Sequence, residues 1–164
     1  MAAAEIELVP LDPSLFAVFR ENLLREYAQD HVRAGQWTAA DADRRAREET
    51  DRILPQGPAT PGHFFFAVRR RPAGDDAGRV WVALRTEGGS VEAFVYDLLV
   101  FEPFRGQGIG EAAMRALEPF ARSHGATRIA LHVFGSNAGA IRLYERIGYE
   151  TTNRLMAKRL PPSP

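Results

Sequence analysis

The sequence predicts an α/β fold in a single domain, with a mixed sheet of about six to seven strands flanked by about four helices. Between positions 64 and 101, three apolar segments follow one another with short turns between them, which is typical of an antiparallel sheet. After position 110, segments with helical spacing alternate with short apolar segments, which favours a parallel crossover. The length of 164 residues fits one domain over positions 1–164.

The N-terminal part predicts a short strand and two amphipathic helices over positions 12–54. Asp12 followed by Pro13 is a helix-start signal, and Gly35 ends or interrupts that helix. Thr38 begins a second helix that extends to Leu54, because Asp41 three residues later gives a pattern like a capping box. The apolar stripe of the first helix consists of Phe16, Phe19, Leu23 and Tyr27.

The middle and C-terminal parts supply the other strands. Aromatic and β-branched residues predict strands at 64–68, 80–84 and 91–101, and a helix follows Gly110. A strand over 128–134 must return to the sheet, so it is expected to pair in parallel with the 91–101 strand. Asn137 then begins a helix that Gly148 ends, and a final strand is expected from Tyr149 onwards.

Composition excludes several classes of protein and partner. Lys plus Arg and Asp plus Glu number 21 each, so there is no basic surplus to attract nucleic acid or an anionic membrane. The chain has no cysteine, and its four histidines, His31, His63, His124 and His132, show no metal-ligand spacing, so no metal is expected. No leader-like start and no long apolar run are present, and we expect a soluble cytoplasmic protein.

A glycine-rich loop follows the apolar 91–101 strand and opens a helix. Gly106, Gly108 and Gly110 stand at alternate positions. A helix N-terminus presents unpaired N–H groups and partial positive charge, and glycines allow a phosphate to approach closely. The spacing differs from the dinucleotide fingerprint G-x-G-x-x-G, and neither lysine nor hydroxyl follows as in a nucleotide-triphosphate loop. We interpret the loop as an anion cradle for a pyrophosphate.

The stretch from Arg105 to Gly110 resembles the Arg/Gln-x-x-Gly-x-Gly/Ala signature of the GCN5-related N-acetyltransferases. In that family the loop holds the pyrophosphate of acetyl-coenzyme A. A second match follows in the expected order: a strand, then Asn137, then a helix that carries Tyr144 and ends at Gly148-Tyr149. The resemblance covers the second half of the chain, and the first half matches only the family's more variable substrate-side helices.

The resemblance implies a strongly bent sheet, an acetyl-coenzyme A-binding core over 91–160 and variable substrate-side helices over 12–54. It also implies a fork between the two central parallel strands, where the backbone bonds the pantetheine arm and the acetyl carbonyl. The implied cofactor-binding residues are Leu98, Leu99, Val100, Arg105, Gly106, Gln107, Gly108, Ile109, Gly110, Glu111, Asn137 and Tyr144. Asn137 can equally act as an N-cap, and both roles are compatible.

Acetyl transfer to an amine needs a neutral nitrogen, a stabilised oxyanion and a proton for the departing thiolate. Tyr144 matches the family's general acid, and a phenol with a pKa of about 10 is protonated at neutral pH. The base is left open among His132, Asp97, the substrate-side residues Glu26 and Tyr27, and relayed water. His132 stands where some relatives place a glutamate, and imidazole is suited to accepting a proton.

The sequence therefore predicts an N-acetyltransferase that moves acetyl from acetyl-coenzyme A to a primary amine by direct attack. The acceptor is a small molecule, a peptide or a protein amine, and a homodimer is compatible with the sequence. One alternative is a coenzyme A-binding regulatory protein without turnover, and Tyr144 argues against it. Another is an acyltransferase that uses a longer acyl-coenzyme A.

Overall fold

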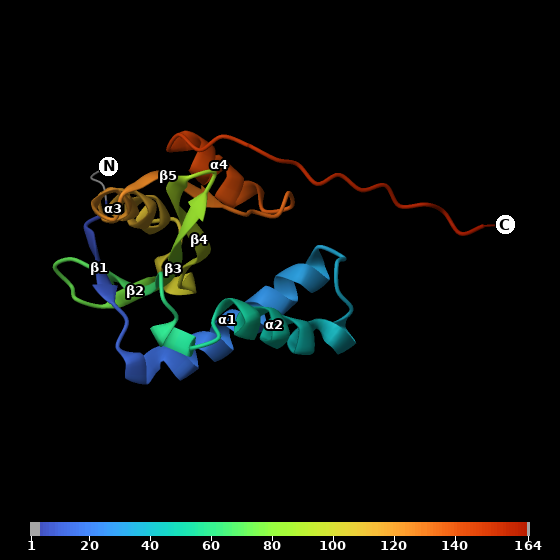
Figure 1. Ribbon diagram of the computed structural model, residues 1–164, viewed down its shortest axis with the longest axis horizontal. Helices are drawn as coiled ribbons and strands as arrows, with labels where there is room; N and C mark the ends of the chain where they lie inside the picture. Colours follow the sequence, from blue (N-terminus) through green and yellow to red (C-terminus); the bar gives the residue numbers. More distant parts are fainter. Residues whose placement is uncertain (1–3, 164) are drawn as a thin grey trace.

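The computed structural model describes residues 4–163 and contains a five-stranded sheet with helices on both faces (Figure 1). The strands are β1 (Ile6–Pro10), β2 (His63–Arg70), β3 (Asp76–Glu87), β4 (Ser90–Val100) and β5 (Ala126–Leu131). The helices are α1 (Phe16–Arg33), α2 (Ala39–Ile53), α3 (Ile109–Ser123) and α4 (Ala138–Arg146). The single α/β domain with four α-helices confirms the predicted fold class.

The strands lie in the order β1-β2-β3-β4-β5, which follows the chain. The first three neighbouring pairs are antiparallel, whereas β4 and β5 are parallel. The parallel pair requires a crossover, and α3 supplies it between the end of β4 and the start of β5. The predicted mixed sheet and its parallel pair are therefore confirmed.

Two expectations about strands are wrong. No strand follows Tyr149: residues 150–163 have neither helix nor strand and are exposed, so the described sheet has five strands instead of six to seven. The apolar residues Leu155 and Met156 predict a strand, but a strand also needs a neighbour to pair with. The fifth strand covers 126–131 instead of 128–134, because its pairing with β4 ends at Leu131.

The sheet lies between helices on its two faces (Figure 1), and an apolar core fills the space on each side. On one face α3 buries its apolar stripe against the sheet, and α4 packs beside it. That core consists of Phe66, Val68, Ala77, Val80, Val82, Ala93, Val95, Ile109, Ala113, Met114, Leu117 and Ala121. The other face is covered by α1 and α2, and this core consists of Phe16, Phe19, Leu23, Leu54, Phe65 and Trp81.

A third cluster joins α1 to α2 and makes them a helical hairpin. Leu24 and Ala28 of α1 pack against Ala42 and Ala46 of α2. The small alanines let the two helices approach closely, and the Thr38 hydroxyl caps α2 by accepting from the Asp41 amide at 3.3 Å. Within residues 4–163, no helix has both the length and the apolar character needed to cross a bilayer.

Truncating Leu24, a buried side chain of this hairpin, tests how much the hairpin's packing contributes to stability. Leu24 is 1% exposed, so Leu24→Ala should lower the free energy of unfolding by about 2–5 kcal/mol through lost burial and a residual cavity. Val18 on the same helix is 63% exposed, and Val18→Ala should change it by less than about 0.5 kcal/mol. Urea unfolding followed by circular dichroism measures both, and equal losses would contradict the assigned burial.

Candidate active site

The parallel strands β4 and β5 separate part of the way along β4. Their pairing runs from Val91 opposite Ala126 to Val95 opposite Leu131 and then stops. On its other side β4 stays paired with β3 as far as Val100. A bulge lies at the point of separation, because Trp81 opposes Asp97 while the next residue of β3 opposes Val95. A bulge bends its strand, so β4 turns away from β5 here and leaves backbone groups without a strand partner.

The backbone of the separated part of β4 alternates between its two sides. The Leu99 carbonyl lies against Gly78 of β3, and the Phe101 N–H donates to the Ala77 carbonyl at 2.8 Å. Because successive backbone groups of a strand point to opposite sides, those of Leu98 and Val100 face the side that β5 has left. Two of the three predicted backbone positions therefore face the gap, and Leu99 faces β3.

The glycine-rich loop forms the N-terminus of α3 beside this gap. Gly108 is the N-cap with φ 77°, a left-handed conformation that favours glycine, and no side chain caps the helix. Gly106 has φ 74°, and a side-chain carbon added to either glycine would meet nothing within 4 Å. The amides at the start of α3 thus lie at an open, positively polarised helix end. Such a cradle fits the pyrophosphate that the sequence predicts.

The side chains of the glycine-rich loop make structural hydrogen bonds, whereas its backbone amides remain open. The Arg105 Nε donates to the Val100 carbonyl at 3.1 Å, and the Gln107 amide donates to the Pro103 carbonyl at 3.1 Å. Both bonds hold the turn between β4 and α3 in shape. Gly110 serves packing, since a side-chain carbon there would lie 3.3 Å from Leu143 of α4.

An ion pair fixes α4 against the start of α3. The Glu111 carboxylate accepts from Arg146 of α4 at 3.1 Å and from Arg115 one turn along its own helix at 3.1 Å. These two arginines hold the pKa of Glu111 below its ordinary value. The contact adds to the apolar packing of Tyr144 and Ile147, which holds the helix that carries Tyr144 against the core.

Tyr144 lies on α4 and is partly buried against the core beneath α3. Burial raises the pKa of its phenol above the ordinary 10.0, and the negative charge of Asp97 on β4 adds to the shift. The hydroxyl therefore stays protonated at neutral pH, and it lies within electrostatic reach of the point where β4 separates from β5. Asn137 caps α4 by accepting from the Ala140 amide at 3.2 Å.

A buried arginine joins two of the predicted residues, Glu26 and Asp97. Arg79 of β3 is 5% exposed, and its guanidinium donates to Asp97 at 2.7 Å and to Glu26 of α1 at 2.8 Å. Burial raises the pKa of both carboxyl groups, and the charge of Arg79 opposes the shift. A buried ion pair needs such compensation, because a charge left without its partner in the interior is unfavourable.

Aromatic side chains connect the end of α1 with the segment after β5. The His31 ring stacks on Trp37, with ring centroids 3.8 Å apart. The rings of Tyr27 and Phe134 pack against it in T-shaped arrangements, with centroid distances of 4.5 and 5.1 Å. The ring of Phe134 also packs against that of His132, with a centroid distance of 5.4 Å. This arrangement brings the predicted Tyr27 and His132 to the same side of the molecule.

The hydrogen bonds of these residues separate their chemical roles. The Tyr27 hydroxyl donates to Glu49 of α2 at 2.7 Å. Burial is the main cause that raises the pKa of Tyr27, and this hydrogen bond is the second. His132 is exposed just beyond the end of β5 and makes no hydrogen bond within residues 4–163. The His132 ring is therefore free to accept a proton, whereas the Tyr27 proton is committed to Glu49.

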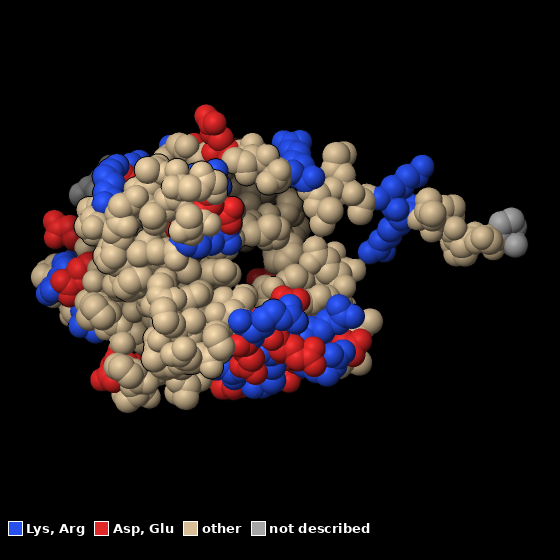
Figure 2. Space-filling view, viewed as in Figure 1, with Lys and Arg blue, Asp and Glu red and all other residues tan. Residues whose placement is uncertain are grey.

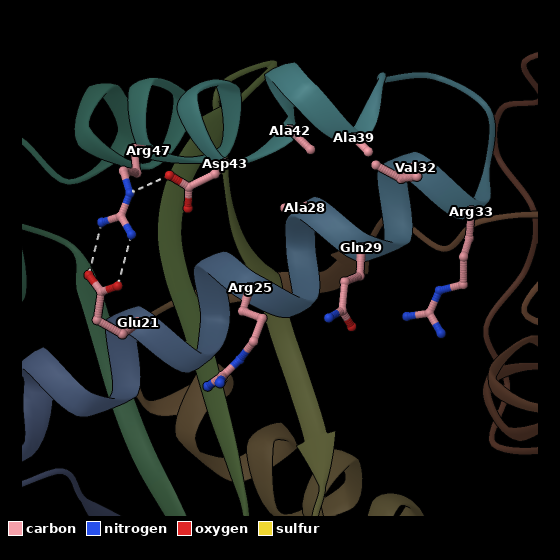
Figure 3. A pocket seen from close by; sticks show the side chains of 10 residues that line it. All are labelled: Glu21, Arg25, Ala28, Gln29, Val32, Arg33, Ala39, Ala42, Asp43 and Arg47. Atoms are coloured by element: carbon pink, nitrogen blue, oxygen red, sulfur yellow. Dashed lines mark hydrogen bonds and ion pairs between the residues drawn. The ribbon is translucent and has the colours of Figure 1, made fainter.

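A groove of about 660 Å³ lies elsewhere, between α1 and α2 (Figure 3). Small apolar residues such as Ala28 and Ala42 line it together with charged side chains, and Arg47 is held between Glu21 and Asp43. It contains none of the predicted site residues. Charged side chains of both signs gather over this hairpin in the space-filling view (Figure 2), which agrees with a solvated outer face.

Sequence reasoning missed Arg79, His31 and Trp37. Arg79 had one available signal, a single charged residue at the start of the apolar run Val80 to Leu84. The positions of His31 and Trp37 depend on how α1 turns into α2, which no local pattern shows. Within residues 4–163, no group of three or more histidine, cysteine or acidic residues is arranged to hold a metal ion.

A mixed sheet whose parallel strands separate beside an open, glycine-rich helix N-terminus is the architecture of an α/β acyltransferase. The model of the Acetyltransferase (GNAT) family matches residues 21–149, and the chain belongs to this family. The family that the two motifs predicted is thereby confirmed, and the protein is an acyltransferase of the N-acetyltransferase type.

Two relatives from Bacillus subtilis strain 168 match most of the chain. The uncharacterized N-acetyltransferase YycN is 34% identical over 94% of this chain and 99% of its own length. The crystal structure of YycN superposes with a TM-score of 0.90 and covers 96% of this chain and 99% of its own. The uncharacterized N-acetyltransferase YdgE is 32% identical over 88% of this chain and 92% of its own length.

The partly buried imidazole of His31 gives a prediction on pH dependence. Its Nδ1 atom is buried with no hydrogen-bond partner within residues 4–163, and burial lowers the pKa below 6.5. The Gln36 side chain, and after it the negative charges of Glu49 and Asp30, oppose that shift. Below pH 6.5 the unfolded chain therefore binds more protons at this residue than the folded one, and stability should fall as the pH decreases.

His31→Phe should remove this contribution, because phenylalanine retains the stack on Trp37 and cannot be protonated. Urea unfolding at pH 7.5 and pH 5.5 measures the effect: the wild-type chain should lose more stability between these values than the variant. His124→Gln, at an exposed position of the chain, is the control and should behave like the wild type. Equal pH dependence of His31→Phe and wild type would contradict the prediction.

Proposed function

We propose that this protein transfers an acetyl group from acetyl-coenzyme A to a primary amine by direct attack. The observation that carries the proposal is the separation of β4 from β5 beside the uncapped N-terminus of α3. A strand-like arm can pair with the free edge of β4 there, while the helix end accepts its phosphates. One extended acyl carrier fits both features at once.

The cradle and the gap supply binding groups from the backbone. The N–H groups from Gly106 to Glu111 bind the pyrophosphate, and Arg105 keeps the loop attached to Val100. The backbone groups of Leu98 and the Val100 N–H face the gap and bond the pantetheine arm and the thioester carbonyl, whereas the Val100 carbonyl accepts from Arg105. Fixed amides that face a developing oxyanion stabilise it without reorganising during the reaction. Asn137 orients the arm while it caps α4.

Tyr144 acts as the general acid. Its raised pKa keeps the phenol protonated until the thiolate departs, and it then donates that proton to sulfur. The Glu111–Arg146 ion pair supports this role by fixing α4 on α3.

His132 acts as the general base in preference to the other candidates. The Asp97 and Glu26 carboxylates are both engaged by Arg79, and the Tyr27 hydroxyl is bonded to Glu49. His132 has an exposed ring and can take a proton from the acceptor's ammonium group, directly or through water, which leaves the neutral amine that attacks the thioester. Glu26 and Tyr27, on α1, then serve on the acceptor side, where negative charge favours an amine substrate.

An assay of thiol release separates this function from its rivals. With acetyl-coenzyme A and a panel of small amines and amino-terminal peptides, free thiol should appear only when an acceptor is present. Binding of the carrier without thiol release for any acceptor would favour a regulatory coenzyme A-binding protein. Faster turnover with succinyl or longer thioesters would favour a different acyl group.

Removing the Tyr144 hydroxyl tests the acid role. Tyr144→Phe should lower kcat by about 10²–10⁴-fold and leave acetyl-coenzyme A affinity nearly unchanged, because the phenol acts on the leaving group. The neighbouring Tyr149, whose pKa burial raises to about 12, gives the control Tyr149→Phe, which should retain turnover. Calorimetry and steady-state kinetics measure the two quantities, and a similar kcat for both variants removes the acid role from Tyr144.

Adding a side chain to Gly108 tests the cradle. Gly108→Val should weaken acetyl-coenzyme A binding by at least about tenfold, because a branched side chain crowds the phosphate and disfavours the left-handed backbone. Gly74, in the connection between β2 and β3, has φ 81° and equally open surroundings. Gly74→Val is therefore a control for backbone strain and should bind normally in calorimetry. Unchanged affinity of Gly108→Val would relocate the phosphate site.

The pH–rate profile tests the base. His132→Ala should lower kcat/KM and remove one ionisation from the acidic limb of the profile, because the base must be deprotonated to act. His124→Ala, at another exposed histidine, is the control and should preserve the profile. If the acidic limb of His132→Ala matches that of the wild type, another group or water accepts the proton.

A further inference from the structure

The acceptor side of the proposed site lies between α1 and the strands β3 and β4. Glu26 of α1 and Asp97 of β4 share the guanidinium of Arg79, at 2.8 and 2.7 Å. Figure 2 shows the molecule hollowed between the α1–α2 hairpin and the part that carries α4, and an acidic side chain is visible inside the hollow. An acceptor that approaches the gap between β4 and β5 from this side therefore passes carboxylate groups.

The charges on this side do not balance. One guanidinium serves two carboxylates, so the group formed by Glu26, Arg79 and Asp97 retains one excess negative charge. Burial raises the pKa of both carboxyl groups in spite of Arg79, and the charge of Asp30, one turn after Glu26, adds to the rise. Arg33 pairs with Asp30 at 2.7 Å, but both side chains are largely exposed and their charges are screened. A further positive charge would therefore be stabilised here.

Glu26 is the member of this group that a ligand can reach. Its side chain is 38% exposed, whereas those of Asp97 and Arg79 are 17% and 6% exposed. Arg79 donates to Oε2 of Glu26, which leaves Oε1 able to accept a hydrogen bond from a ligand. The guanidinium also lies over the Phe19 ring, 5.3 Å from its centroid, so the carboxylate is held in place before a ligand binds.

The reacting nitrogen of an acceptor and this carboxylate make opposite demands. The attacking amine must be neutral, because a protonated nitrogen has no lone pair with which to attack. A carboxylate beside an ammonium group stabilises the charged form and raises its pKa. Glu26 would therefore slow the reaction if it bound the nitrogen that attacks. Its charge suits a second positive group of the acceptor, one that does not react.

Aromatic rings border the same stretch of α1. Tyr27 and His31 are four positions apart and share one stripe of the helix, next to the stripe of Glu26 and Asp30. The Tyr27 and His31 rings pack with a centroid distance of 4.5 Å, and Phe134 lies 5.1 Å from His31. An apolar wall beside a carboxylate suits the methylene chain of an aliphatic amine, and aromatic rings also attract cations.

We infer that the acceptor is an aliphatic amine with two positively charged groups, a diamine or a longer polyamine, and that Glu26 binds the group that does not react. The inference rests on the proposed acetyl transfer and names its acceptor class. Arg79 is then a positioning residue, because it holds the Glu26 carboxylate.

The two ends of such an acceptor have different fates. The reacting ammonium gives up one proton to His132, the neutral nitrogen bonds to the acetyl carbon, and the C–S bond breaks. The thiolate takes the Tyr144 proton. The second proton of the nitrogen passes to water, from which the Tyr144 oxygen is reprotonated. The other ammonium group stays charged on Glu26 throughout.

Matched acceptors test the class. Diaminohexane and aminohexanol have the same chain and the same reacting amine, and they differ in whether the far end is charged; diaminobutane and aminobutanol form a shorter pair. In at least one pair the diamine should have a kcat/KM at least tenfold higher, mainly through a lower KM. The advantage should shrink as potassium chloride is raised, because salt screens the far charge. Values within twofold in both pairs would overturn the inference and leave acetyl transfer in place.

Glu26→Gln removes the charge and keeps the shape of the side chain. The ratio of kcat/KM for the diamine to that for its amino alcohol should fall at least tenfold in this variant, whereas a merely structural defect would lower both values together. Glu21→Gln is the control, since Glu21 lies on the same helix and pairs with Arg47 of α2 at 2.9 Å. It should keep the wild-type ratio. An unchanged ratio in Glu26→Gln would overturn the role of Glu26.

Calorimetry in the presence of coenzyme A separates a failure of this inference from a failure of the proposed reaction. Diaminohexane should bind the wild-type protein at least tenfold more tightly than it binds Glu26→Gln, and aminohexanol should bind both proteins weakly. If no acceptor releases thiol, the proposed transfer fails, and this comparison alone decides whether Glu26 binds the second cation. Equal affinities of the diamine for the two proteins would overturn that assignment.

Discussion

The site depends on β4 being paired along its whole length with β3 but only as far as Val95 with β5. A sheet normally uses both edges of an internal strand, so the backbone groups of Leu98 and the Val100 N–H would otherwise be bonded to a neighbouring strand. The bulge around Tyr96 bends β4 at the point where pairing with β5 ends, and the same bend leaves room beside the start of α3. The gap and the helix N-terminus thus arise from one local irregularity.

The packing on the two faces gives this irregularity its fixed shape. On one face α3 is buried along its apolar stripe, and Glu111 attaches α4 to it through Arg146. On the other face the buried Arg79 links α1 to β4 through Glu26 and Asp97. The helix that carries the acid and the acceptor-side helix α1 are therefore both held near the C-terminal part of β4, one on each face of the sheet. A buried charge that must satisfy two carboxylates permits few alternative positions for α1.

The exposed surface of the molecule differs in charge from one region to another. The outer face of the α1–α2 hairpin is covered with ion pairs of both signs, which maintain solubility and contribute little to stability (Figure 2). The apolar C-terminal segment is the exception to this pattern.

Local patterns in the sequence determined most elements and the family. The caps Thr38 and Asn137, the glycines of the loop and the helical spacing of the apolar residues act over a few residues, and the structure has the helices they predict. The two motifs also determined the family, because their order and separation are properties of the chain itself. The loop and Tyr144 could be selected as site residues for the same reason.

The tertiary structure alone decided which residues meet. Arg79 meets Glu26, which lies 53 positions away, His31 meets Phe134 across the molecule, and Leu99 faces β3 while its neighbours face the gap. The final strand failed as a prediction for a related reason: Leu155 and Met156 have strand character, but a strand forms only where another edge is available. Local propensity is a property of a few residues, whereas pairing, burial and charge compensation depend on distant parts of the chain.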